Sequence, residues 1–366
     1  MKTFTQTLSV LPSGTCEAVS RHAVLFDIET TGLSAARSHL YMIGAASHRG
    51  GTWTLTQWFP DRPAEELLLL QTFSEYLSEA CCDVLCSYNG DTFDLPYLRS
   101  KYAFYGLACP FDGIESLDLY RVLRPYRQLC GLSSMKQKDV ERFAGIMRED
   151  TMSGKELIQV YHDYLRTGSS GCLELLLLHN RDDLLGLAGI LPVMVLDTLF
   201  RGRFSDVSFS SEENEPDSAA YIAFRIKVPG TFPAGLLLER EFCTLEASSG
   251  DDFCIMKVLV LRGALLHFFA DYSNYWYLPE EDQAIHKSVA QYVDKEHRVR
   301  ASAASCYQKA SGLFIPQPSE IIQPAFRRFY KDKVAWLRVE DLGSAGADVL
   351  REYAAAMLGA ALKEKF

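Results

Sequence analysis

A short apolar segment that ends in two carboxylates constrains the fold of this chain more than any other feature. Ala23 to Phe26 is an unbroken apolar run, and Asp27, Glu29 and a Thr-Thr-Gly turn at 30–32 follow it directly. Such a run is typical of a strand that is buried on both faces. Side chains two residues apart in a strand project from the same face, so Asp27 and Glu29 point the same way. We therefore expect a buried strand with paired carboxylates at its end.

Paired carboxylates at the end of a buried strand repel each other and are costly to bury without a partner. A divalent cation relieves that repulsion, and hard cations such as Mg²⁺ and Mn²⁺ prefer carboxylate oxygens. An isolated Asp-x-Glu is also compatible with an ordinary strand end that faces solvent. The metal interpretation therefore depends on motifs further along the chain.

The second motif follows another short apolar segment. Residues 83–88 predict a buried strand, and the polar run from Asn89 to Asp94 comes directly after it. Asp94 precedes Leu95-Pro96, where a helix is expected to begin. Asp94 is thus a candidate metal ligand, with a helix N-cap as the alternative, whereas Asp91 is expected to be a surface carboxylate.

The third motif lies on a long predicted helix, residues 172–196. His179 and Asp183 are four residues apart, so they share one helix face and can reach one site together. Asp182 is rotated by about 100° from Asp183 and is expected to face solvent. The alternatives are a solvated Asp183 beside Arg181 and a hydrogen-bonded His179 packed near the site.

The three motifs together resemble those of the DEDD superfamily of 3′–5′ exonucleases, which have the ribonuclease H-like fold. Residues 26–33 are similar to the first motif of that superfamily, residues 88–94 to the second and residues 179–183 to the third. With Met152-Ser153-Gly154 and the long helix, the combination is most similar to the YprB-type predicted exonucleases. The resemblance covers residues 21–200.

The resemblance implies two divalent metal ions, Mg²⁺ or Mn²⁺, and a role for each matching residue. The implied ligands are four carboxylates: Asp27, Glu29, Asp94 and Asp183. His179 is the implied general base. The residues implied to contact or position the terminal nucleotide are Thr30, Thr31, Leu33 and Asn89. One departure concerns His179: the His-type branch usually has its His five residues before the last Asp, and here the separation is four, as in the Tyr-type branch.

The length of 366 residues suits two domains. We expect a lead-in segment at 1–20, an α/β ribonuclease H-like exonuclease domain at 21–203, a linker at 204–218 and an α+β accessory domain at 219–366. In the first domain a mixed sheet is flanked by helices. The expected helices are 63–80, 95–105, 133–143, 154–165 and 172–196, and the expected hairpin strands are 39–47 and 51–59. In the accessory domain, strands are expected within 219–228, 235–245 and 253–269, and helices at 321–330 and 345–363.

Composition limits the classes of function. The first residues lack a hydrophobic signal core, no apolar run approaches membrane-spanning length, and the ten cysteines form no paired CxxC spacing, so we expect a cytoplasmic protein with reduced thiols. The net charge of −10 argues against avid, non-specific nucleic-acid binding, but metals would offset clustered carboxylates. The expected substrate is nucleic acid with single-stranded 3′ ends, without a choice between DNA and RNA.

Two other functions use the same residues. One is a non-catalytic nucleic-acid-binding or scaffolding module on the same fold, and the other is a structure-specific endonuclease. In the accessory domain, Tyr275-Trp276-Tyr277 could stack on unpaired bases or could belong to the core.

Overall fold

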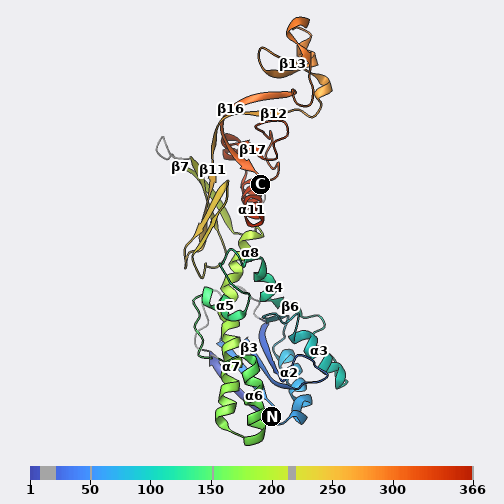
Figure 1. The fold of residues 1–366 in the computed structure, drawn as a ribbon, viewed down its shortest axis with the longest axis vertical. Helices are drawn as coiled ribbons and strands as arrows, with labels where there is room; N and C mark the ends of the chain where they lie inside the picture. The colour runs from blue at the N-terminus through green and yellow to red at the C-terminus, as the bar shows by residue number, and fades with distance from the viewer. Residues whose placement is uncertain (9–21, 50–51, 151, 213–219, 365–366) are drawn as a thin grey trace. The chain divides into compact units, whose positions relative to one another are not determined.

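The computed structural model describes residues 1–8, 22–49, 52–150, 152–212 and 220–364. The chain forms two compact units (Figure 1). Unit 1 comprises Met1–Asp197 with Gly230–Ala234, and unit 2 comprises Thr198–Pro229 with Gly235–Phe366.

Unit 1 contains a six-stranded mixed sheet in the order β1-β4-β3-β2-β5-β6. The first four strands in this order pair antiparallel, and β5 and β6 continue the sheet in parallel from β2. This arrangement confirms the expected α/β class. Their bounds are β1 Lys2–Leu8, β2 Ala23–Thr30, β3 Leu40–Arg49, β4 Thr52–Phe59, β5 Val84–Ser87 and β6 Glu115–Asp118.

Helices cover both faces of this sheet, so β2 in its interior is buried on both sides. Val24, Phe26 and Ile28 pack in one core with α2 (Glu66–Glu79) and α3 (Asp94–Phe104). On the other face, α6 (Gly154–Thr167) and α7 (Ser170–Ile190) lie side by side, and α7 contacts β2, β3 and β4 (Figure 1). The strand alternation therefore directs Asp27 and Glu29 toward α7.

Most predicted elements of unit 1 are present, with shifted ends. The predicted helix 133–143 begins later, as α5 (Gln137–Phe143), and Ser134 Oγ accepts the N–H of Lys136 just before it. The predicted helix 172–196 is α7, which ends at a 3₁₀ turn containing Pro192. The shorter helical segments are η1 Pro63–Glu65, α4 Leu119–Leu123, η2 Arg124–Tyr126, η3 Leu191–Met194 and α8 Val195–Phe200.

One helical segment in the described part of the chain, Ser170–Phe200, is long and apolar enough to cross a membrane by length and composition alone. The mean hydropathy of its most apolar 18-residue window is 1.8, so the expectation that no apolar run approaches membrane-spanning length is wrong. Yet 72% of its most apolar window is buried inside the protein. The apolar character of this segment is that of a core helix, because its side chains face the sheet and neighbouring helices.

The described part of unit 2 contains three antiparallel sheets. Their orders are β7-β8-β11-β10-β9, β12-β16-β17 and β14-β13-β15. The strands are β7 Asp206–Glu212, β8 Tyr221–Lys227, β9 Leu236–Glu239, β10 Cys243–Ala247, β11 Phe253–Leu259, β12 Leu261–Phe268, β13 Tyr275–Leu278, β14 Gln283–His286, β15 Val299–Arg300, β16 Tyr307–Gln317 and β17 Ala335–Arg338. The helical segments are η4 Tyr272–Asn274, α9 Lys287–Ala290, η5 Lys295–His297, α10 Val339–Gly343 and α11 Ala347–Lys363.

Three predicted segments differ in the structure or lie partly outside the described residues. The predicted helix 321–330 is wrong: Pro324 has no N–H to continue a helix, and Phe326 instead exchanges backbone hydrogen bonds with Trp336. Residues 2–8 of the predicted lead-in form β1, and residues 206–212 of the predicted linker form β7. Residues 9–20 and 213–218 of those two segments lie outside the described residues.

The aromatic run of unit 2 makes contacts within the chain. The guanidinium carbons of Arg298 and Arg300 lie 4.9 and 4.4 Å from the ring centroid of Trp276. Tyr275 stacks on Phe269 with ring centroids 4.6 Å apart. The binding of unpaired bases by this run stays a prediction.

Candidate metal centre

Carboxylates from β2, α3 and α7 converge at one place in unit 1. Asp27 and Glu29 lie near the end of β2, Asp94 is the first residue of α3, and Asp183 lies within α7. Burial raises the pKa of Asp27 well above its ordinary range, and the charges of Asp183, Glu29 and Asp94 raise it further. Four like-charged groups are thus close enough to perturb one another.

The pKa values of Glu29 and Asp94 are raised as well. For Glu29 the causes are burial and then the charge of Asp183, opposed by a hydrogen bond from Tyr41. Burial raises the pKa of Asp94 from 3.8 to about 7, although backbone N–H groups, including that of Ile28 on β2, hold its carboxylate. The residue in the N-cap position of α3 is Phe93, so the alternative of Asp94 as N-cap is wrong.

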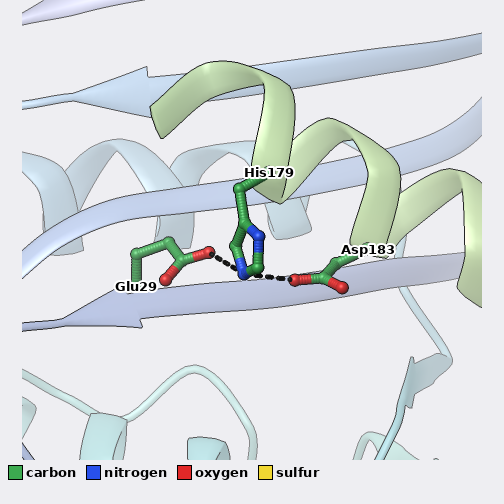
Figure 2. A group of neighbouring side chains, drawn as sticks. All are labelled: Glu29, His179 and Asp183. Atoms are coloured by element: carbon green, nitrogen blue, oxygen red, sulfur yellow. Dashed lines mark ion pairs between the residues drawn. The ribbon is translucent and has the colours of Figure 1, made fainter. Parts of the chain in front are cut away.

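His179 stands between two of these carboxylates. Its Nε2 lies 3.1 Å from Asp183 Oδ2 and 3.8 Å from Glu29 Oε1 (Figure 2). One ligand atom from each of the three side chains lies within 4.8 Å of the others. The four-residue spacing on α7 therefore brings His179 and Asp183 to one point, as predicted from the sequence.

In three of the four carboxylates, one oxygen accepts a hydrogen bond from a neighbouring side chain. Asp27 Oδ2 accepts from Asn180 Nδ2 at 2.9 Å, Glu29 Oε2 from the Tyr41 hydroxyl at 3.3 Å, and Asp183 Oδ1 from Arg148 at 2.6 Å. The second oxygens of Glu29 and Asp183 face His179. Such outer partners orient metal ligands in proteins.

The close approach of α7 to the sheet depends on Asn180 and Gly44. Asn180 is 0% exposed and accepts from Gln57 Nε2 at 2.9 Å while it donates to Asp27. Gly44 on β3 faces it: a Cβ there would lie 2.0 Å from Asn180 Oδ1 and 2.7 Å from Leu184. Only glycine leaves room for the amide that connects the helix to the strand.

A loop between α5 and α6 orients the imidazole. Asp150 Oδ2 lies 2.7 Å from His179 Nδ1, and the Asp150 carboxyl is buried. Burial opposes its ionisation, but hydrogen bonds from Met152 N–H and His179 outweigh this and lower the pKa of Asp150. An ionised Asp150 places the ring proton on Nδ1, which leaves Nε2 as the nitrogen that can accept a proton.

The expectation that Asp182 faces solvent is wrong. Asp182 is 6% exposed, and its Oδ2 accepts the N–H groups of Glu149 at 3.0 Å and Asp150 at 2.8 Å. The helical wheel gives its direction correctly, but the loop 149–150 covers that side of α7. Asp182 therefore holds the loop that supports His179. Asp91, expected at the surface, is partly buried and pairs with Arg121.

Asn89 adopts a backbone conformation with φ of 65°, which Asn tolerates better than most residues. Its N–H donates to Asp118 Oδ1 at 2.8 Å, and the N–H of Asp91 donates to Asp118 Oδ2 at 3.2 Å. Asp118 ends β6 and also caps α4. This carboxylate thus fixes the loop that leads to Asp94.

The residues predicted to contact the terminal nucleotide lie in the turn after β2. Thr30 Oγ1 donates to Gly32 O at 3.0 Å, and Thr31 Oγ1 accepts the N–H of His39 at 2.9 Å. Leu33 is 87% exposed. Both threonines therefore hold the turn, and the apolar side chain of Leu33 in this turn is left open to contact.

Four residues of the centre were missed from the sequence: Asn180, Arg148, Asp150 and Asp118. Asn180 had a usable signal, because it is adjacent to His179 in a helical motif and an amide in an apolar helix needs a partner. Arg148 and Asp150 belong to an irregular segment without periodicity, and no signal indicated them.

The donor set fits divalent cations. Buried carboxylates that raise one another's pKa are costly without a counter-charge, and oxygen ligands suit Mg²⁺ and Mn²⁺. Arg148 supplies a cation to Asp183, and Asn180 supplies a neutral donor to Asp27. Among the described residues, Asp27, Glu29 and Asp94 have no ion pair with Lys or Arg.

Comparisons with known proteins agree with this fold. Residues 24–195 match the model of the RNase_H superfamily. The chain is 26% identical over 171 residues to the uncharacterized protein YprB of Bacillus subtilis (strain 168), an alignment covering 45% of this chain and 40% of YprB. It is 33% identical over 99 residues to a DNA polymerase of Pyrococcus glycovorans, covering 25% of this chain and 13% of the polymerase.

Among solved structures, the family B DNA polymerase of Pyrobaculum calidifontis matches 69% of this chain and 35% of the polymerase, with a TM-score of 0.37 and 16% identity. The matched segments span less than half the length of each relative. The match to the superfamily model confirms the expected ribonuclease H-like fold for residues 24–195.

Proposed function

We propose that unit 1 is a metal-dependent 3′–5′ exonuclease that hydrolyses phosphodiester bonds in DNA or RNA. The observation that carries the proposal is that ligand atoms of Glu29, His179 and Asp183 lie within 4.8 Å of one another, while the charges of Glu29, Asp94 and Asp183 raise the pKa of Asp27 beside them. Similarity to the RNase_H superfamily and to a DNA polymerase supports nucleic acid as the substrate.

The four carboxylates are the proposed metal ligands. When bound, two Mg²⁺ or Mn²⁺ ions would neutralise these carboxylates and stabilise the negative charge that develops on the phosphate. Asn180, Tyr41 and Arg148 hold the ligands in place through the oxygens that they contact.

His179 is the proposed general base. Its Nε2 would accept the proton of the attacking water, because the ring proton lies on Nδ1 and leaves Nε2 with a free electron pair. Asp150 holds the ring at Nδ1 and stabilises the positive charge that forms on it. His179 has the four-residue spacing of the Tyr-type branch. The hydrogen bond to Asp150 nevertheless directs its Nε2 toward Glu29 and Asp183.

The turn after β2 is the proposed contact for the terminal nucleotide. Leu33 offers exposed apolar surface to the base, and Thr30 and Thr31 fix the backbone beneath it. Asn89 is proposed to position the same nucleotide from the loop before Asp94.

The test uses single strands labelled at the 5′ end, incubated with full-length protein and either Mg²⁺ or Mn²⁺. We expect a ladder of products shortened one nucleotide at a time from the 3′ end, and no products in EDTA. Asp183→Asn should lower the rate by at least a hundredfold. Asp163→Asn, which alters a partly exposed carboxylate paired with Arg166, is the matched control and should retain the parental rate.

Three outcomes would contradict the proposal. Cleavage by Asp183→Asn at the parental rate would exclude this site. Internal cuts without a ladder would favour an endonuclease with the same carboxylates. Strand binding without cleavage under any metal would favour a binding module.

A further inference from the structure

A cavity of about 430 Å³ adjoins the candidate metal centre within unit 1. His179 and Asp183 form part of its wall, and three cationic side chains, Lys136, Lys138 and Arg148, form another part. Asp183 is the only carboxylate among the residues that line it. These three cations gather around one cavity beside the candidate metal centre, although the net charge of the chain is −10.

Two of the three cations have internal partners. Arg148 is mostly buried and pairs with Asp183 and Glu141. Lys138 Nζ lies 3.2 Å from Asp150 Oδ2 and donates to Met152 O at 3.1 Å. These two side chains therefore give the cavity wall a fixed positive charge while they support the site.

Lys136 differs from both. It is exposed, and no ion pair involving its side chain occurs in the part of the chain that the structure describes. It directly precedes α5, and the backbone there is held by a hydrogen bond from Lys136 N–H to Ser134 Oγ at 3.2 Å. The ammonium group is thus free to bind a ligand, while its backbone is anchored.

The start of α6 forms a further part of the cavity wall. Ser153 and Gly154, the N-cap and first residue of α6, also line the cavity. A Cβ at Gly154 would meet nothing within 4 Å, so the backbone at this point is open to a ligand. The N-terminus of α6, a helix of 14 residues, carries partial positive charge and therefore attracts an anion, as the lysines do.

We propose that this cavity binds a backbone phosphate of the substrate, next to the phosphate that is cleaved, with Lys136 as the direct contact. The proposal rests on the proposed function for the nature of the substrate. Ammonium and guanidinium groups recognise phosphate oxygens, and contacts of this kind position a strand without reading its sequence. Such a contact would add to the proposed active site, because a strand held at two phosphates is oriented for cleavage at one of them.

The test measures binding apart from hydrolysis. A fluorescein-labelled single strand is titrated with full-length protein in Ca²⁺ at several KCl concentrations, and a gel verifies that the strand stays intact. We expect Lys136→Gln to raise the Kd about fivefold or more at low salt. It should also reduce the slope of log Kd against log salt by about 0.7, the value for one phosphate contact on a single strand. Lys136→Arg should restore both quantities.

The matched control is Lys155→Gln, which removes an exposed lysine at the start of α6 that does not line the cavity. This variant should bind like the parent, and equal effects of the two glutamine variants would overturn the proposal. Inorganic phosphate added as a competitor should weaken strand binding by the parent more than by Lys136→Gln. Equal competition would also overturn it.

Failure of this inference differs from failure of the proposed function. Strand cleavage with a Kd that does not depend on Lys136 would overturn the phosphate site alone. Binding that depends on Lys136 without cleavage in Mg²⁺ or Mn²⁺ would support the phosphate site and contradict the exonuclease.

Discussion

Asp150 Oδ2 and His179 Nδ1 lie 2.7 Å apart in a part of unit 1 where both side chains are buried. The pair is held from a second direction, because Asp182 on α7 accepts the N–H groups of residues 149 and 150. One helix thus carries both the imidazole and the carboxylate that fixes its supporting loop. The orientation of the His179 ring is therefore set by α7 and the loop that packs on it.

Substitution of Asp150 tests this support. Asp150→Asn retains an acceptor of similar shape but loses the charge that stabilises a protonated imidazole. We expect kcat on a labelled strand to fall about 10- to 100-fold, the range found for outer partners of active-site ligands, with KM changed less than twofold. Steady-state kinetics with Asp163→Asn as control measure this. A kcat within twofold of the parent would remove Asp150 from the mechanism.

Gly44 tests the contact between β3 and α7. Gly44→Ala places a methyl group 2.0 Å from Asn180 Oδ1, so the helix must shift. We expect a loss of roughly 1–3 kcal/mol in the free energy of unfolding, as for overpacking, together with lower activity.

The matched control for Gly44→Ala is Gly171→Ala on α7, the helix that Gly44 faces, where the atom nearest to the new Cβ would be 3.7 Å away. Alanine is the better helix former there, so stability should be unchanged or slightly higher. Chemical denaturation of both variants decides the matter. Equal stabilities would show that α7 does not depend on Gly44.

The pH dependence of the metal-free protein follows from the raised pKa of Asp94. A carboxyl whose pKa is higher in the folded state contributes stability that is complete below its unfolded pKa near 4 and is lost as pH rises through about 7. At about 1.4 kcal/mol per pKa unit, Asp94 alone accounts for a few kcal/mol between those limits. Asp27 and Glu29 act in the same direction because their pKa values are also raised.

We therefore expect the unfolding free energy in EDTA to fall between pH 4 and pH 7 more steeply for the parent than for Asp94→Asn. Mg²⁺ should reduce that difference, because it stabilises the ionised carboxylates. Denaturant titrations at fixed pH values measure both effects. Parallel pH curves for the two proteins in EDTA would mean that Asp94 ionises normally.

The part of the site that could be predicted from the sequence depends on the spacing of residues within one strand or one helix. The separation of two residues placed Asp27 and Glu29 on one face of a strand, and the separation of four placed His179 and Asp183 on one face of a helix. Both patterns depend only on backbone geometry, which neighbouring residues determine. The order of three motifs then indicated the superfamily fold.

The remainder depends on contacts between distant residues. Asp182 was assigned to solvent because a helical wheel does not show what covers each face, and the loop 149–150 covers this one. Arg148 reaches Asp183 from an irregular segment that has no period. In unit 2, residues 321–330 have apolar spacing that suggests a helix, but Phe326 pairs with Trp336 along the chain instead.

The proposed function requires that Asp27, Glu29, Asp94 and Asp183 bind divalent cations together, which a Mn²⁺ titration measures. Free Mn²⁺ measured by electron paramagnetic resonance in a titration of full-length protein should indicate two bound ions per chain. Asp27→Asn should lose at least one of them, while Asp163→Asn should keep both. Mn²⁺ binding that is absent in the parent, or unchanged in Asp27→Asn, would contradict the account.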